Sequence, residues 1–244
     1  MGAALVKARA EDLPGYSQRK AIENKHRSAI RRALEQVSGI KAAVEQAVAN
    51  GATDPVHAQA VANHAVTQNV SVNADHMAQA ITQATQDAIA AGQARATADG
   101  VAVADSVGSR AQSLLGSIQT GAQQIMQNSM TRAAQVIAEG VLIGRGVDDL
   151  VSAVSDAISS DSRADMIAVT QVNIAENLSY LDQIGMAGYP EWEWLAYEGA
   201  CDYCEENAGP HDLNDLSAWD DRHPNCRCAC VLPENANDLS ITEE

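Results

Sequence analysis

The chain contains no phenylalanine and few aromatic residues of any kind. Aromatic residues make up 3% of its 244 positions, and all of them except Tyr16 lie between Tyr180 and Trp219. The stretch from Ala42 to Ser179 has none and is rich in Ala, Gln, Val, Asn and Thr. Because each of those side chains buries little apolar area, they are poorly suited to a thick globular core. We therefore expect thin helices that pack closely through alanine and form an elongated region.

Long apolar runs and a leader are also missing. No run approaches the roughly 20 apolar residues that span a bilayer. The start of the chain lacks a charged region followed by an apolar core, so we expect no signal peptide, and Val6 stands where a myristoylation signal has Ser or Thr. We expect no membrane contact and a protein made in a cytosol, where thiols stay reduced.

Positive charge is scarce and unevenly placed. The 16 Lys and Arg stand against 32 Asp and Glu, which gives a formal net charge of -16. Every lysine lies at or before Lys41, and from Gly185 onward the only basic residues are Arg222 and Arg227. An acidic surface repels phosphate backbones, so nucleic-acid recognition is disfavoured as the main role. The basic N-terminal part could touch DNA or an acidic protein, although a solvated helix face is the simpler interpretation.

Capping signals divide the first part of the chain into helices. Pro14-Gly15 precedes a predicted helix over residues 17–49, and Asn50-Gly51 closes it. Asp54-Pro55 is typical of an N-cap followed by a first-turn proline and opens a second helix. A break near Asp99-Gly100 leads to a third long helix, and two further helices are predicted to end near residues 158 and 184. Narrow stripes of small residues along these helices allow intrachain packing or self-association.

The pattern changes after Gly185. The aromatic, partly alternating stretch from Trp192 to Tyr197 is typical of a strand with one buried face, and the alternation from Cys226 to Val231 suggests a second short strand. The sequence therefore predicts a mainly α fold, with an extended helical N-terminal region and a small C-terminal α+β module that zinc stabilises.

All five cysteines fall within this module. Cys201 and Cys204 form a C-x-x-C pair, and His223-Pro-Asn-Cys226-Arg-Cys228 follows after a loop. Two such groups supply the thiolates and imidazole that tetrahedral zinc prefers. We predict a structural zinc site made by Cys201, Cys204, His223 and one or both of Cys226 and Cys228. The fourth ligand stays open, with Cys230 and His211 as alternatives. Ordinary buried thiols, or disulfides formed under oxidising conditions, are the competing interpretation.

Catalysis has little support in the sequence. The C-x-x-C pair and His-Pro-Asn superficially resemble zinc-supported HNH nucleases, but those need further histidines, and only His211 and His223 lie nearby. There is no Gly-rich phosphate loop, nucleophile elbow or H-E-x-x-H motif. The acidic residues around the cysteines could bind a hard cation, but a solvated face is the simpler interpretation. We predict that the protein is not an enzyme.

Four motifs, in order, resemble the phage Mu F-like minor head proteins, also called head morphogenesis proteins. They are Gly140-Val-Leu-Ile-Gly-Arg-Gly146 with Asp149-Leu150, the helix from Arg163 to Asn177, the segment from Trp192 to Gly209, and His223-Pro-Asn-Cys226-Arg-Cys228. The last is the most specific, since that family ends in His-Pro-x-Cys-Arg-Cys. Two departures are that Val169-Thr170-Gln171 replaces an Arg-Thr-Glu signature, and that Asp221-Arg222 precedes His223 without the usual second proline.

The resemblance implies a virion component inside the capsid near the portal, made in the host cytoplasm. It would aid head assembly, genome packaging or delivery, with the portal protein and other head proteins as partners. We expect an assembly region over residues 1–130, the head morphogenesis domain over 131–233 with its zinc module at 189–233, and an acidic tail over 234–244. The basic N-terminal part could meet the portal or make weak contact with packaged DNA. The alternative class is a cytosolic zinc-binding adaptor with a coiled-coil arm.

Overall fold

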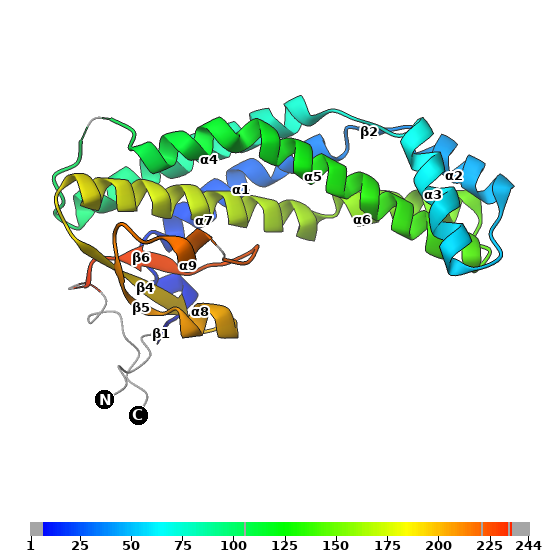
Figure 1. Ribbon diagram of the computed structural model, residues 1–244. Coiled ribbons are helices and arrows are strands. Elements are labelled where there is room, and N and C mark those ends of the chain that lie inside the picture. Colours follow the sequence, from blue (N-terminus) through cyan, green and yellow to red (C-terminus); the bar gives the residue numbers. More distant parts are fainter. Residues whose placement is uncertain (1–6, 105, 221, 234, 236–244) are drawn as a thin grey trace. The chain divides into compact units, whose positions relative to one another are not determined.

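The computed structural model describes residues 7–104, 106–220, 222–233 and 235, and most of them are helical (Figure 1). The helices are η1 Ala10–Asp12, α1 Tyr16–Leu34, α2 Ile40–Asn50, α3 Pro55–Asn69, α4 Ala74–Ala98, α5 Ser109–Leu142, α6 Val147–Ser159, α7 Asp161–Met186, α8 Asp202–Glu206 and α9 Ser217–Asp220. The strands are β1 Lys7–Ala8, β2 Val37–Ser38, β3 Ser71–Val72, β4 Glu191–Tyr197, β5 Gly209–Asp212 and β6 Ala229–Val231. The predicted mainly helical fold, with a small C-terminal sheet that carries the cysteines, is confirmed.

The chain divides into two compact units, each assembled from separate segments. Unit 1 contains Met1–His26, Thr82–Gly116 and Met166–Glu244, and unit 2 contains Arg27–Ile81 and Ser117–Asp165. Helices α1, α4, α5 and α7 each contribute residues to both units. The domain boundaries expected near residues 130 and 233 stay a prediction.

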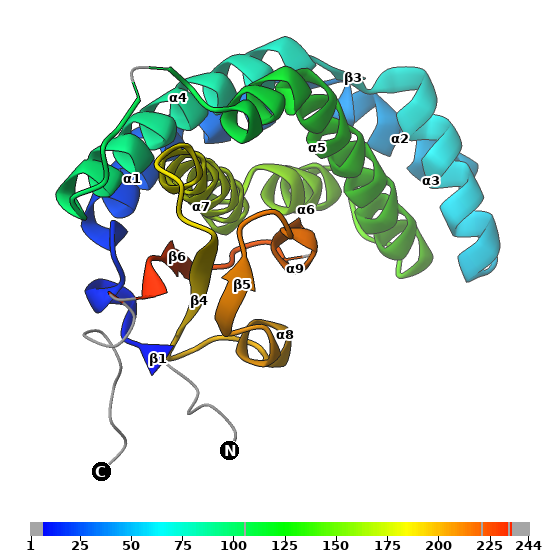
Figure 2. The ribbon, with the colours of Figure 1, turned by 60° about the vertical axis from the view of Figure 1, so that its left-hand side comes forward.

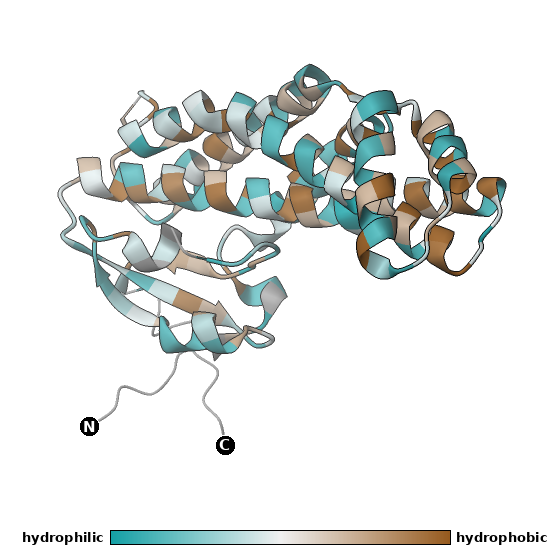
Figure 3. Ribbon diagram, turned by 45° about the vertical axis from the view of Figure 1, so that its right-hand side comes forward, coloured by the Kyte–Doolittle hydropathy of each residue, from teal (hydrophilic) through white to brown (hydrophobic). Residues whose placement is uncertain are grey.

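Unit 2 has a core built from small side chains. Helices α2 and α3 form a hairpin, and its buried alanines, such as Ala47 and Ala62, pack in one cluster with Ile137 of α5 and Val154 of α6. No aromatic residue belongs to this cluster among the described residues. Figure 3 shows apolar and polar residues alternating along these helices, as expected where only a narrow face of each is buried. The prediction of closely packed, alanine-rich helices is confirmed for this core.

The predicted continuous helix over residues 17–49 is wrong, because the chain leaves α1 after Leu34 and begins α2 at Ile40. Between them Val37 and Ser38 pair antiparallel with Val72 and Ser71, so two short strands connect the α2–α3 hairpin to the longer helices. Gly39 follows with a φ of 81°, in the left-handed region that favours glycine, and its missing side chain leaves room for the carbonyl of Asn69.

Capping signals elsewhere are confirmed. Asp54 accepts hydrogen bonds from the backbone N–H groups of Val56 and His57 at the start of α3, where Pro55 is the first helical residue. Gly51, with a φ of 63°, ends α2, and Gly100, with a φ of 78°, follows α4. Local signals therefore placed these helix ends correctly.

Unit 1 contains the four-stranded sheet and all of the aromatic residues. Strand β4 lies centrally (Figure 2): β5 pairs antiparallel on one side, with Trp192 opposite His211, while β6 pairs antiparallel, with Trp194 opposite Cys230. The N-terminal strand β1 extends this sheet by pairing parallel with the end of β4. The core between the sheet and α7 contains fully buried Trp192, Trp194, Trp219 and Tyr180, as well as Cys204, Cys226 and Cys228. The predicted strand from Trp192 to Tyr197 is confirmed as β4.

Candidate metal centre

The first pair of predicted ligands lies where β4 turns into α8. The chain turns at Glu198–Ala200, Cys201 stands at the N-cap of α8, and Cys204 lies one turn into that helix. Residues three apart share a face of a helix, so the two side chains converge. Cys201 is exposed, whereas Cys204 is fully buried. One cysteine of the pair therefore faces the solvent, and the other lies in the interior of the module.

The second group depends on a tight turn at Asn225. This residue has a φ of 66°, a left-handed conformation that Asn tolerates better than most residues. Its backbone N–H donates a hydrogen bond of 2.9 Å to the hydroxyl of Thr170 on α7. The turn brings His223 and Cys226 to the same place, and Cys228 follows just before β6.

All five predicted ligands meet in one thiol–imidazole cluster, which consists of Cys201, Cys204, His223, Cys226 and Cys228. They form two overlapping groups, one of Cys201, Cys204 and His223 and one of Cys204, Cys226 and Cys228, and within each group the ligand atoms lie within 4.8 Å of one another. Cys204 belongs to both groups. Its Sγ lies 3.2 Å from Nε2 of His223 and 3.7 Å from Sγ of Cys226. The cluster could hold a metal ion.

Hydrogen bonds orient the donors of the cluster. Nδ1 of His223 lies 2.7 Å from the carbonyl oxygen of Pro224, which can only accept, so Nδ1 donates to it and Nε2 is the ring nitrogen that faces Cys204. Hydrogen bonds from the thiols of Cys204 and Cys226 lower the pKa of Cys228, and the same contacts with burial raise the pKa of Cys204, so the thiolate of the three rests on Cys228. Thiolate and neutral imidazole are the forms that bind metal, and this soft donor set suits zinc.

Two alternative ligands lie outside the cluster. Nε2 of His211 donates to the carbonyl oxygen of Asn207, and its ring stacks on Trp192 at a centroid distance of 4.7 Å. Cys230 is fully buried, and this burial raises the pKa of its thiol well above the usual range. Among the described residues, neither joins a group of potential ligands. His211 and Cys230 therefore contribute to the packing of the module and not to the candidate metal site.

A polar row on α7, formed by Thr170, Asn173 and Asn177, holds the backbone of the ligand-bearing segment (residues 225–230). Besides the contact of Thr170 with Asn225, Nδ2 of Asn173 donates to the carbonyl oxygen of Cys228 at 2.9 Å. Oδ1 of Asn177 accepts from the backbone N–H of Cys230 at 2.8 Å. Sequence reasoning missed this role, although the i, i+3, i+7 spacing marks one helix face.

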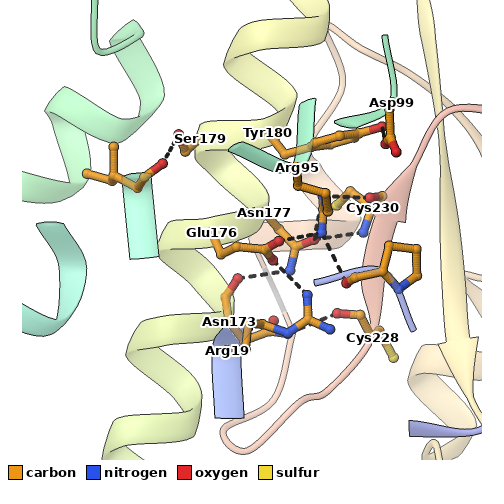
Figure 4. A network of polar contacts seen from close by, with 12 residues as sticks. Arg19, Arg95, Asp99, Asn173, Glu176, Asn177, Ser179, Tyr180, Cys228 and Cys230 are labelled. Carbon is orange, nitrogen blue, oxygen red and sulfur yellow. Dashed lines mark hydrogen bonds and ion pairs between the residues drawn. The ribbon is translucent and has the colours of Figure 1, made fainter. Parts of the chain in front are cut away.

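A buried ion-pair network continues from the polar row (Figure 4). Glu176, with no exposed surface, accepts from Arg95 through Oε1 and from Arg19 through Oε2, both at 2.7 Å. Arg95 also donates to the carbonyl oxygen of Cys230 at 2.8 Å, and its guanidinium lies 3.8 Å from the ring centroid of Tyr180. These contacts join α1, α4 and α7 to β6, the strand that contains Cys230.

Among the described residues, no helix combines the length and the apolar character needed to cross a bilayer. Searches against protein-family models, curated proteins and solved structures find no match to this chain.

Proposed function

We propose that this chain is a structural minor head protein of a tailed phage, in which one zinc ion holds the C-terminal module together. It would lie inside the capsid near the portal and aid head assembly, genome packaging or delivery. The observation that carries this proposal is a contact between two of the motifs that resemble the Mu F-like family. Thr170, in the helix motif, binds the backbone of Asn225, in the His-Pro-Asn-Cys turn. Since the helix motif holds the turn of the His-Pro-Asn-Cys motif, the two would be expected to occur in one chain.

Other motifs of the resemblance also make local sense. Gly140 leaves no room for a side chain beside Leu150, and both residues belong to the first motif. Val169 and Gln171 replace the family's Arg and Glu, but the same helix carries a buried ion pair at Glu176. The departure therefore does not deprive α7 of an acidic partner for arginine.

The site supports a structural rather than a catalytic ion. The two overlapping groups together offer five protein donors, Cys201, Cys204, His223, Cys226 and Cys228. Four of them would fill a tetrahedral site and leave no open position for a substrate. The other histidine of the module, His211, is engaged by Asn207 and Trp192. When bound, the ion would fix the two ligand groups relative to each other.

Ion pairs on α1 favour a protein partner over packaged DNA. Lys25 pairs with Asp87 within unit 1, and Arg31 pairs with Asp161 within unit 2. Arg27 pairs with Asp165 in the same way. Because these acidic side chains already neutralise part of the helix, less positive charge is available to phosphate groups. We therefore propose the portal protein as the principal partner.

Metal analysis of the purified chain and of phage particles tests the proposal. We expect about one zinc per chain, its loss in Cys204→Ser, and its retention in the matched Cys230→Ser variant. The chain should be present in phage particles and co-purify with the portal protein of the same phage. A zinc-bound chain that is absent from particles and does not co-purify with the portal protein would favour the cytosolic adaptor. Metal-dependent nicking of DNA that His223→Ala abolishes would favour a nuclease.

A further inference from the structure

The N-terminal segment (residues 8–19) rests on the strand that directly follows the cysteine ligands. Ala8 pairs with Tyr197 in the parallel β1–β4 ladder, and its carbonyl accepts from the N–H of Glu198 at 2.8 Å. Ala8 and Leu13 are both buried, and they pack in one cluster with Ala229 and Val231 of β6. The surface on which this segment lies therefore begins one residue after Cys228.

A second attachment runs through Glu176. Gly15 has a φ of 74°, and a side chain there would stand 2.5 Å from Oε1 of Glu176, so the backbone passes directly over this carboxylate. Four residues later, Arg19 donates to the other carboxylate oxygen at 2.7 Å. The same carboxylate binds Arg95, which in turn holds the carbonyl of Cys230. One acidic side chain thus joins the N-terminal segment to the ligand-bearing segment.

This attachment depends on exclusion of water. Arg19 is 2% exposed, Arg95 is 7% exposed and Glu176 is fully buried, so two positive charges and one negative charge share a dry site. Such a cluster is stable only while every charge keeps its partners and the surrounding groups keep water out. The carbonyl of Cys230 is one of those partners. Movement of residues 226–230 would remove it and open the site to solvent.

We propose that metal occupancy controls the docking of the N-terminal segment. With the ion bound, Cys226 and Cys228 are fixed, β6 stays in register with β4, and the segment packs against it. Without the ion, residues 226–230 loosen, Arg95 loses the Cys230 carbonyl, and the segment leaves β4 and β6. This inference rests on the zinc centre of the proposed function and adds a conformational output to it.

Hydrogen exchange of the full chain, measured by mass spectrometry with and without a zinc chelator, tests this. We expect chelation to raise amide exchange in residues 8–19 by about tenfold or more, and zinc to restore protection. Peptides from α2 and α3 in unit 2 are the internal reference and should not change.

Two variants separate docking from metal binding. Arg19→Met removes the segment's own ion pair with Glu176 and should speed exchange in residues 8–19 while zinc stays bound. Arg31→Met, the same change on the same helix away from Glu176, should leave that exchange unchanged. If zinc binds and its removal leaves exchange in residues 8–19 unaltered, the inference is overturned and the metal centre stands. If the chain binds no zinc at all, both are overturned.

Discussion

The two units solve the problem of a stable interior in opposite ways. The core of unit 2 consists of Ala, Val, Ile and Leu side chains from four helices, without charge or aromatic ring among its described members. The core of unit 1 contains all three tryptophans, several thiols and, nearby, a fully buried glutamate between two arginines. Unit 2 therefore depends on many small contacts of similar weight. Unit 1 depends on a few groups, and replacing any one of them leaves its partners without their contacts.

Metal removal should cause the largest difference in behaviour between the two units. Because Trp192, Trp194 and Trp219 pack in one core with Cys204, Cys226 and Cys228, and unit 2 has no tryptophan, tryptophan fluorescence reports on unit 1 alone. We expect chelation, or Cys204→Ser, to expose the tryptophans and shift their emission to the red, while most helical circular dichroism remains. Cys230→Ala is the control and should keep both zinc and the native emission. Unchanged fluorescence after complete removal of the ion would contradict a metal-dependent core.

Loss of one buried charge should cost unit 1 far more than loss of an exposed charge costs unit 2. Glu176→Gln leaves two buried arginines without a counter-charge and should lower the free energy of unfolding by about 3–5 kcal/mol. Asp161→Asn removes an exposed partner of Arg31 and should cost less than about 0.5 kcal/mol. Urea denaturation of both variants measures the difference. Equal effects would mean that Glu176 is not truly excluded from water.

Unit 2 should instead be sensitive to added volume. Ala62 is fully buried where α3 packs in the alanine-rich core, so Ala62→Leu must push helices apart and should cost about 1–3 kcal/mol. The same change at the exposed Ala60 on the same helix should be nearly neutral. Thermal unfolding followed by circular dichroism compares the two. A neutral Ala62→Leu would show that this core is loosely packed.

The smallest expected effect is a pH dependence confined to unit 1. Burial raises the pKa of Tyr180, which stands above Arg95 and donates to Asp99 at 2.7 Å. A raised folded-state pKa means that the native state holds this proton more tightly. The stability that Tyr180 contributes is therefore complete below about pH 10, its unfolded pKa, and falls as the pH rises further. Tyr180→Phe should flatten the alkaline end of a stability–pH curve. Titration of Tyr180 at its ordinary pKa, seen by tyrosinate absorbance, would contradict this.

Local chemistry made part of this architecture predictable. Asp54 and Pro55 start α3, Gly51 ends α2, and the five candidate ligands from Cys201 to Cys228 lie in one cluster that could hold a metal ion. These features depend on neighbours in sequence, for which capping and knuckle patterns are reliable guides.

Features that depend on distant segments were not predictable in the same way. The break at Gly39 is required by the carbonyl of Asn69, thirty residues on, which no local pattern announces. Thr170, Asn173 and Asn177 look like ordinary polar positions of a helix until the ligand-bearing segment packs on them. Arg95 is a single basic residue in α4, and only the fold reveals its contact with Cys230.

The pairing of β1 with β4 also has a consequence for how the protein is made. Its two strands stand at Lys7–Ala8 and Ala196–Tyr197, about 190 residues apart. At typical synthesis rates of 5–20 residues per second, the first strand emerges about 10–40 s before its partner. All residues of unit 2 are synthesised within that interval, so unit 2 can fold before β1 has its partner. The pairing of β1 with β4 can therefore form only after the whole of unit 2 has been synthesised.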